Sequence, residues 1–338
     1  MKKSLRTQQT VTRRRVLAAV GASVVGAGLS SSALSWAQTA YPNRPIKLVV
    51  PWPPGQATDL GARVLGQELS KSLGVAVVIE NKAGAGGTIG TDSVAKAAPD
   101  GYTLLAASSG PVTVSPLLQK TPYDVERDLV PIGMMGMSPY VLVTAPDFPA
   151  KDTSELIALI KANPRKYSFA SSGTGATAHL IAESFNAALG LQAIHVPYKG
   201  STPALTDVIS GQVSYCIETA AATMPFVRNG RLKAYGVSLE KGSSVTPGIP
   251  TLAVTASIAG FDMGAWLGVM VPTGTPKPIV ERLAVEVEKA MQAPEVKRAF
   301  TTIAVEVDYR KADELTRYLK TVSSQFSEVI KRNNIKLD

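Results

Sequence analysis

The 338-residue chain is poor in the residues on which several protein classes depend, since it has one cysteine and two histidines. The single cysteine, Cys216, excludes an intrachain disulfide. It lies in an apolar run that predicts a strand, so we interpret it as a buried packing residue. The histidines, His179 and His195, are sixteen residues apart with no third ligand nearby. This spacing is poor for a metal, and we expect neither a metal site nor a cofactor.

A basic cluster is also lacking once the first 37 residues are set aside. The chain carries 35 basic and 26 acidic residues, and six of the basic ones lie in that segment, which leaves 29 against 26. A protein that binds nucleic acid requires a basic face with clustered lysines and arginines. The remaining chain is close to neutral, and we expect no nucleic-acid partner.

Residues 1–37 have the layout of an export signal. A basic stretch without acids precedes an apolar run from Val16 to Leu29, and small residues follow up to Ala37. The segment from Thr12 to Leu17, with three consecutive arginines, resembles a twin-arginine signal. A membrane anchor is the alternative, but glycines and serines interrupt the roughly 20 strongly apolar residues that it needs. We therefore predict cleavage after Ala37 and a periplasmic product.

Short apolar runs alternate with helical patterns through most of the remaining chain. The predicted strands are Ile46–Val50, Ala76–Ile79, Thr103–Ala106, Val141–Thr144, Ser168–Ala170, Ala193–Val196 and Val213–Ile217. The predicted helices are Thr58–Leu73, Ser154–Ala162, Thr177–Leu189 and Thr202–Ile209. Such alternation predicts an α/β fold whose mostly parallel sheets are flanked by helices.

The length of the chain predicts two lobes, because about 300 residues exceed the usual size of one hydrophobic core. We expect residues 38–140 and 267–338 to form the first lobe and residues 141–266 the second, with crossing segments near Tyr140 and Trp266. The C-terminal part is helical in pattern, with an apolar stripe at Leu315, Leu319, Val322 and Phe326.

Two loops rich in small residues stand out. The first, Pro51–Asp59, follows the strand Ile46–Val50, and the second, Ser171–Ala176, follows the strand Ser168–Ala170. Each lies at the carboxyl end of a strand and the start of a helix, where unpaired backbone N–H groups and the helix dipole favour an anion. Each loop alone can be a plain tight turn. Neither has the lysine of a nucleotide-binding P-loop or G-x-G-x-x-G spacing, so a nucleotide is disfavoured.

Together, the two loops predict an anion-binding cleft between two lobes, since ligands of open α/β sheets bind at the carboxyl ends of strands. A third glycine-rich loop, Asn81–Gly90, either lines this cleft or only turns the chain. Trp52 can roof the cleft or simply pack. Glu218 follows the strand Val213–Ile217 and so points at the cleft or into solvent, and Lys199 is either a counter-ion of the ligand or an exposed lysine.

Several ordered motifs of the chain resemble those of the Bug family, the periplasmic receptors of tripartite tricarboxylate transporters. The motifs are Pro51-Trp52-Pro53-Pro54-Gly55 with Asp59, Asn81-Lys82 with Gly84-Ala85-Gly86-Gly87, Pro99-Asp100-Gly101-Tyr102, Ser172-Gly173-Thr174-Gly175 with His179-Leu180, Val196-Pro197-Tyr198-Lys199-Gly200 and Gly211-Gln212-Val213. The resemblance implies a two-lobed, type II-like periplasmic-binding fold that closes on a small organic carboxylate held by main-chain N–H groups. It also implies membrane transporter subunits as partners, and we expect a monomer.

The loops and the resemblance together define the expected ligand site. Its residues are Trp52, Pro54, Gly55, Gln56, Ala57, Thr58, Asp59, Ser171, Ser172, Gly173, Thr174, Gly175, Ala176 and Glu218. The chain departs from the family at Gln56, where a second glycine is usual, and at Thr255–Ser257, where an acidic residue is common. The first departure leaves the identity of the carboxylate open.

An enzyme needs a nucleophile with its base, or an acid/base pair within reach. The only serine–histidine combination that the sequence suggests is Ser171 with His179, and its loop lacks the G-x-S-x-G pattern. We therefore expect a receptor and no catalytic residues. The alternatives are a periplasmic hydrolase and a ligand-sensing subunit of a signalling partner.

Overall fold

The computed structural model describes residues 41–332, so the predicted export signal and its cleavage site lie outside the described residues. The strands are β1 (Ile46–Val50), β2 (Val77–Asn81), β3 (Thr103–Ser108), β4 (Leu129–Thr144), β5 (Ser168–Ser171), β6 (Ile194–Pro197), β7 (Tyr215–Thr219), β8 (Lys233–Val237), β9 (Gly264–Pro272) and β10 (Glu306–Lys311). The helices are α2 (Ala57–Leu73), α3 (Thr88–Ala95), α4 (Ser115–Leu118), α5 (Val125–Asp128), α6 (Thr153–Ala162), α7 (Thr177–Leu189), α8 (Ser201–Ile209), α9 (Ala220–Arg228), α10 (Leu252–Thr255), α11 (Lys277–Gln292), α12 (Pro294–Thr302) and α13 (Ala312–Arg332). Within this range, no helix has the length and apolar character required to cross a membrane.

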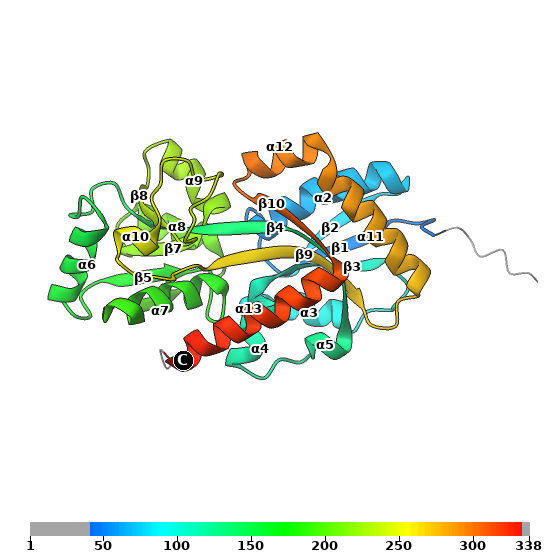
Figure 1. The fold of residues 1–338 in the computed structure, drawn as a ribbon, viewed down its shortest axis with the longest axis horizontal. Coiled ribbons are helices and arrows are strands. Elements are labelled where there is room, and N and C mark those ends of the chain that lie inside the picture. The colour runs from blue at the N-terminus through cyan, green and yellow to red at the C-terminus, as the bar shows by residue number, and fades with distance from the viewer. Residues whose placement is uncertain (1–40, 333–338) are drawn as a thin grey trace, which may run out of the picture. The chain divides into compact units, whose positions relative to one another are not determined.

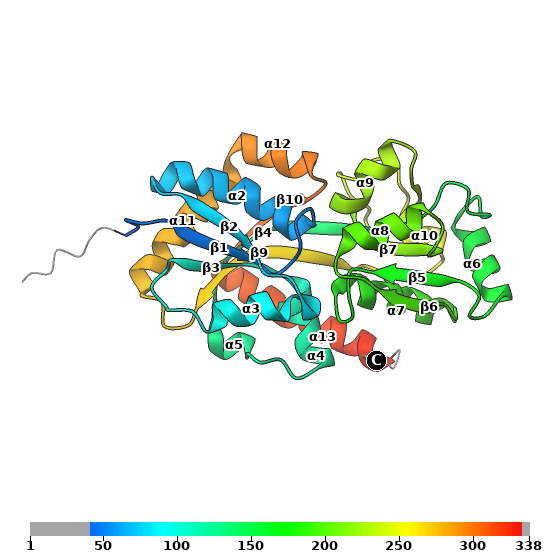
Figure 2. The ribbon, with the colours of Figure 1, turned by 180° about the vertical axis from the view of Figure 1, so that it is seen from behind.

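The predicted α/β fold is confirmed. Ten strands form one sheet in the order β2-β1-β3-β9-β4-β7-β5-β6, with β8 and β10 also paired to β4. Two groups of three strands are parallel, β2-β1-β3 and β7-β5-β6. Antiparallel pairs join them through β4 and β9, which run between the two parts of the sheet in both views (Figures 1 and 2). We call the part around β1 the first part of the sheet and the part around β5 the second.

The long strand β4 is the largest difference from the predicted elements, because the sequence pattern indicated only Val141–Thr144. Its earlier residues include glycines and prolines, which usually interrupt strands. The structure explains Gly136, since a Cβ there would lie 2.2 Å from the carbonyl oxygen of Glu306. The glycine admits the backbone of β10 beside β4, and only the tertiary pairing shows this.

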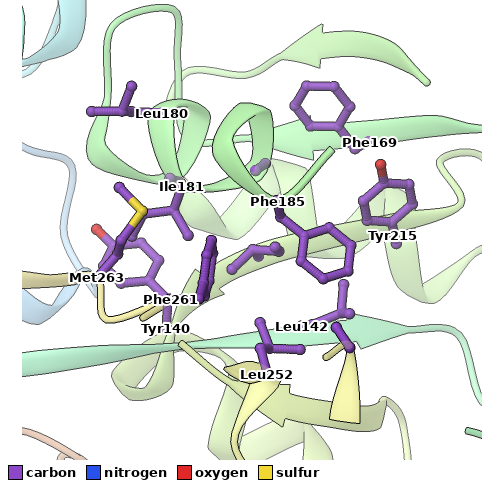
Figure 3. Packing of buried hydrophobic residues seen from close by; sticks show 14 of the residues in the cluster. Tyr140, Leu142, Phe169, Leu180, Ile181, Phe185, Tyr215, Leu252, Phe261 and Met263 are labelled. Atoms are coloured by element: carbon purple, nitrogen blue, oxygen red, sulfur yellow. The ribbon is translucent and has the colours of Figure 1, made fainter. Parts of the chain in front are cut away.

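Side-chain alternation places the apolar residues of the second part of the sheet on both of its faces. On β4, Leu142 packs into a core with residues of α6, α7 and α10, whereas Val141 and Val143 pack on the opposite face with residues of α8 and α9. Figure 3 shows the first of these cores, with Leu142 and Tyr215 from the strands beside Phe185 from α7. Because both faces of these strands are buried, their sequences are short, nearly continuous apolar runs, which is the pattern seen in the sequence.

Each of the two crossing strands, β4 and β9, contributes residues to two separate apolar cores. Met134 and Trp266 belong to the core of the first part of the sheet, whereas Tyr140 and Ala265 belong to that of the second. Helix α13 joins both, because Leu315 packs into the first core while Val322 and Phe326 pack into the second. The predicted apolar stripe of this helix is therefore buried, but the two cores share it, whereas the prediction assigned the whole helix to the first lobe.

Candidate ligand-binding cleft

A small cavity lies where the loops after β1, β3, β5 and β7 meet. Its volume is about 20 Å³, which is room for about one water molecule. Its lining comes from both parts of the sheet and consists of Trp52, Gln56, Ala57, Thr58, Ser108, Gly110, Tyr140, Ser172, Thr177, Glu218, Thr219, Ala265 and Leu267. The carboxyl ends of β1, β3, β5 and β7 all point to it, as expected for a ligand site in an α/β protein.

The first loop is held in shape by Asp59, whose side chain is 1% exposed. Its carboxylate accepts hydrogen bonds from the Gly55 N–H at 2.9 Å, from the Arg63 guanidinium at 2.9 and 3.0 Å, and from the Asn81 amide at 2.8 Å. Burial raises the pKa of Asp59, but these hydrogen bonds outweigh burial and hold the pKa below its usual value. Asp59 therefore supports the loop from behind and does not line the cavity.

Because the pKa of Asp59 is lowered on folding, its contribution to stability is present above the unfolded pKa of about 3.9 and is lost as the pH falls through the folded value. We expect Asp59→Asn to lower the free energy of unfolding at pH 7 by about 1.5–3 kcal/mol, the range for hydrogen bonds to a charged group. The difference in the free energy of unfolding between the wild type and Asp59→Asn should be smaller near pH 3. Urea denaturation at both pH values measures this, with Asp313→Asn as the control, since Asp313 forms an exposed ion pair with Arg317. A stability difference that is the same at both pH values would contradict a role for the ionised form of Asp59 in holding the loop.

The second loop is held by two stacked histidines. The Ser171 hydroxyl lies 2.7 Å from His195 Nε2, and the rings of His195 and His179 stack with their centroids 4.0 Å apart. Burial and then the neighbouring His179 lower the pKa of His195 to about 3, so His195 is neutral. His179 Nδ1 accepts the Gly175 N–H at 3.3 Å and so caps the second loop. Ser171 bonds to His195 rather than to the His179 that the sequence suggested, and it is fully buried outside the cavity lining, where a substrate in the cavity does not contact it.

Three helices begin at the cavity. The first residues of α2 (Ala57 and Thr58) and of α7 (Thr177) line it, as does Thr219, which directly precedes α9. The first N–H groups of a helix lack intrahelical partners, and the helix dipole gives them partial positive charge. The three helix ends together favour a negatively charged group in the cavity.

The Ala176 N–H is not one of these available donors, because it already donates to the Gly173 carbonyl at 3.0 Å. Ala176 itself has extended backbone angles as the residue preceding α7. The helix begins at Thr177, as predicted, and Thr177 lines the cavity whereas Ala176 does not.

Three buried polar atoms of the cavity lining have no hydrogen-bond partner within the described part of the protein. They are Gln56 Nε2, Glu218 Oε2 and Thr219 Oγ1. All three residues are at least nine-tenths buried. Because buried polar groups are almost always satisfied, their gathering in one cavity makes it the candidate site for a polar ligand.

Glu218 is the ionisable group of the cavity. Its Oε1 accepts the Thr219 N–H at 2.8 Å. Burial raises the pKa of Glu218, and the Thr219 N–H and the nearby hydroxyls of Ser172, Ser201 and Thr219 offset this only in part. None of these hydroxyls forms a hydrogen bond of regular geometry with Oε2. The sequence alternative of a solvated loop acid does not fit a side chain that is 1% exposed.

Some of the expected site residues line the cavity, and the others do not. The lining contains Trp52, Gln56, Ala57, Thr58, Ser172 and Glu218. The expected residues outside the lining are Pro54, Gly55, Asp59, Ser171, Gly173, Thr174, Gly175 and Ala176. Trp52 both lines the cavity and packs, since its Nε1 donates to Ser108 Oγ at 2.8 Å. Lys199 is exposed and lies outside the lining.

Sequence reasoning missed seven lining residues, namely Ser108, Gly110, Tyr140, Thr177, Thr219, Ala265 and Leu267. Ser108 and Thr219 end strands that the sequence did predict, so the rule for carboxyl strand ends could have found them. Tyr140, Ala265 and Leu267 come from the crossing strands β4 and β9. Their position depends on sheet pairing, and no local motif signals it.

The third glycine-rich loop turns the chain rather than lining the cavity. A Cβ at Gly86 would lie 3.1 Å from the carbonyl oxygen of Thr174, so this loop rests against the second loop from across the cleft. A Cβ at Gly200 would likewise meet Pro53 Cγ at 2.8 Å. Loops from the two parts of the sheet are thus in direct contact, and the cleft is closed.

A larger groove of about 670 Å³ lies between α5 and α13 and is lined by residues such as Tyr123, Leu129 and Lys320. None of the unpaired buried polar atoms of the described residues belongs to its lining. In the same range, no group of three histidine, cysteine, aspartate or glutamate side chains has an arrangement that could hold a metal ion. The small cavity is therefore the candidate site.

A cleft built from helix N-termini at the centre of a sheet with two parallel groups of strands defines a solute-binding protein. Residues 61–335 match the family described as the tripartite tricarboxylate transporter family receptor. The chain belongs to this family, which is one of periplasmic binding proteins and not of enzymes. The resemblance to the Bug family seen in the sequence is thereby confirmed.

Individual relatives match almost end to end. The protein BugT of Bordetella pertussis is 38% identical over 325 residues, covering 96% of this chain and 98% of BugT. A Rhodopseudomonas palustris protein solved with adipate is 28% identical with a TM-score of 0.84, over 88% of this chain and 99% of that one. The protein MatC of the same organism, solved with bound malate, is 32% identical with a TM-score of 0.81, over 86% and 100%.

Proposed function

We propose that this protein captures a small organic carboxylate between two lobes and delivers it to the membrane subunits of a tripartite tricarboxylate-type transporter. The observation that carries the proposal is the convergence of the N-termini of α2, α7 and α9 on one buried cavity. Backbone N–H groups and helix dipoles there stabilise an anion without a basic side chain. The relatives solved with adipate and malate support this class of ligand.

In this proposal the lobes are residues 38–140 with 267–338 and residues 141–266, and the protein is exported by its N-terminal signal. On β4 the change from the first core to the second falls between Met134 and Tyr140, and on β9 the change between the two cores falls between Ala265 and Trp266. These positions support the proposed boundaries. Because the cavity of about 20 Å³ is too small for a carboxylate, ligand entry requires the loops from the two lobes to separate. Opening and closing about the crossing strands is the hinge motion typical of such receptors.

The proposal is tested by a thermal-shift screen of the mature protein against mono-, di- and tricarboxylates, including aromatic acids, followed by titration calorimetry of the hits. We expect at least one carboxylate to raise the melting temperature and to bind with one-to-one stoichiometry, while neutral amides and esters of the same skeleton do not. The absence of any carboxylate ligand, or equal binding of the neutral analogues, would refute the proposal.

A further inference from the structure

Two side chains of the cavity lining carry buried polar atoms that the helix N-termini do not explain. They are Glu218, whose Oε2 is an unpaired acceptor, and Gln56, whose Nε2 is an unpaired donor, and they come from opposite sides of the cleft. They are 1% and 7% exposed, so both side chains are shielded from bulk solvent. A ligand that forms no hydrogen bond with them leaves two buried polar atoms without a partner, which lowers its affinity.

We propose that Gln56 and Glu218 form a subsite that selects carboxylates carrying a second, neutral group able both to donate and to accept hydrogen bonds, namely a hydroxyl or a primary amide. This inference rests on the proposed function, since it assigns the first carboxylate to the helix N-termini. A hydroxyl or amide donates to Glu218 Oε2 and accepts from Gln56 Nε2, so both unpaired atoms are satisfied at once.

Other end groups satisfy the subsite less well. A methyl group leaves both atoms unpaired. An ammonium group donates to Glu218 but has no acceptor for Gln56. A second carboxylate accepts from Gln56 but places its oxygens against Glu218, and two carboxylates at one site cannot both stay ionised without a large penalty.

A dicarboxylate can therefore bind only together with a proton. Burial raises the pKa of Glu218, which lowers the cost of protonating it. Two other titratable groups lie close enough for Glu218 to raise their pKa, Tyr140 on β4 and Cys216 on β7. Burial is the main cause in both, and both pKa values lie well above their usual range, so these groups stay neutral between pH 6 and 8. The groups that α2, α7 and α9 present to the cavity are amides, hydroxyls and backbone, which leaves Glu218 as the site of proton uptake.

The test uses ligands matched in chain length and different only at the far end. One series is succinamate, 4-hydroxybutyrate, 4-aminobutyrate, butyrate and succinate, and a longer one is adipamate, 6-hydroxyhexanoate, 6-aminohexanoate, hexanoate and adipate. At pH 8 we expect the amide or hydroxyl member of the better-fitting series to bind the wild type at least tenfold more tightly than the dicarboxylate and the methyl-ended acid. Dicarboxylate affinity should rise towards pH 6, by up to about tenfold per pH unit for one proton taken up, whereas that of the amide should not.

Two substitutions locate the effect. Glu218→Gln should bring the ratio of amide affinity to dicarboxylate affinity below threefold. The pH dependence of dicarboxylate binding that remains should be only that caused by titration of the free ligand. Gln56→Gly should reduce the same preference with little change in melting temperature. Glu240→Gln is the control, because Glu240 is an exposed acid outside the cavity lining.

The outcomes separate the two proposals. If no carboxylate binds, the proposed function fails. If carboxylates bind but the dicarboxylate is the tightest ligand of the wild type at pH 8, the subsite is overturned while the function stands. Because this ranking uses only wild-type protein, the test does not depend on the folding of Glu218→Gln, and an unchanged ratio in a folded Glu218→Gln variant would equally overturn the subsite.

Discussion

Ala57→Pro is expected to weaken carboxylate binding ten- to a hundredfold. Ala57 is the first residue of α2 and lines the cavity. Proline removes its N–H but is tolerated at the first position of a helix. The preceding residue, Gln56, has φ −79° and ψ 160°, which is the extended conformation that a residue before proline adopts. The loss of one charge-assisted hydrogen bond, about 1.5–3 kcal/mol, corresponds to this change in affinity.

Two variants control this experiment. Ala57→Val adds similar bulk but keeps the N–H, so it should bind clearly more tightly than Ala57→Pro. Lys199→Ala removes an exposed basic side chain near the cleft and should change the affinity by less than about threefold, which is within the range of an exposed charge. Titration calorimetry gives the affinities and thermal melts show that each variant is folded. If Lys199→Ala abolishes binding while Ala57→Pro does not, a salt bridge holds the ligand and the main-chain model is wrong.

Gly200→Ala should impair closure of the cleft and lower ligand affinity by about 5- to 150-fold, which corresponds to the 1–3 kcal/mol that overpacking costs. The new Cβ would lie 2.8 Å from Pro53 Cγ, an atom contributed by the loop on the other side of the cleft. An open protein does not experience this clash, so the cost falls on the ligand-bound state. Small-angle scattering should show compaction with ligand in the wild type and a reduced change in Gly200→Ala.

Gly200 also has a φ of 121°, at which alanine is strained in the open and closed states alike. The double variant Gly200→Ala with Pro53→Ala separates the two effects, because it removes Cγ but leaves the backbone strain. We expect the double variant to regain most of the affinity and Pro53→Ala alone to bind almost like the wild type. Equal affinity of the single Gly200→Ala variant and the double variant would show that the Pro53 contact does not govern closure.

Part of the lining of the candidate cavity was predicted, because the rules that place those residues are local. A strand such as Ile46–Val50, followed by a loop of small residues and a helix, specifies a helix N-terminus at a strand end without reference to the rest of the chain. Gln56, Ala57 and Thr58 were found in this way and line the cavity. The same loops also contain residues with a supporting role, such as Asp59, and a sequence motif does not separate the residues that face the ligand from those that support them.

The sequence by itself determined the α/β class, the helix starts after β1 and β5 and the family of periplasmic receptors, because apolar periodicity and the glycine- and proline-rich loops are properties of neighbouring residues. Only the tertiary structure decided that β4 runs through both parts of the sheet, that Tyr140 and Leu267 reach the cavity, and that Gln56 and Glu218 face it with unpaired atoms. These features depend on which strands pair and how closely the loops approach. Such contacts join residues that are far apart in the sequence, so no local pattern records them.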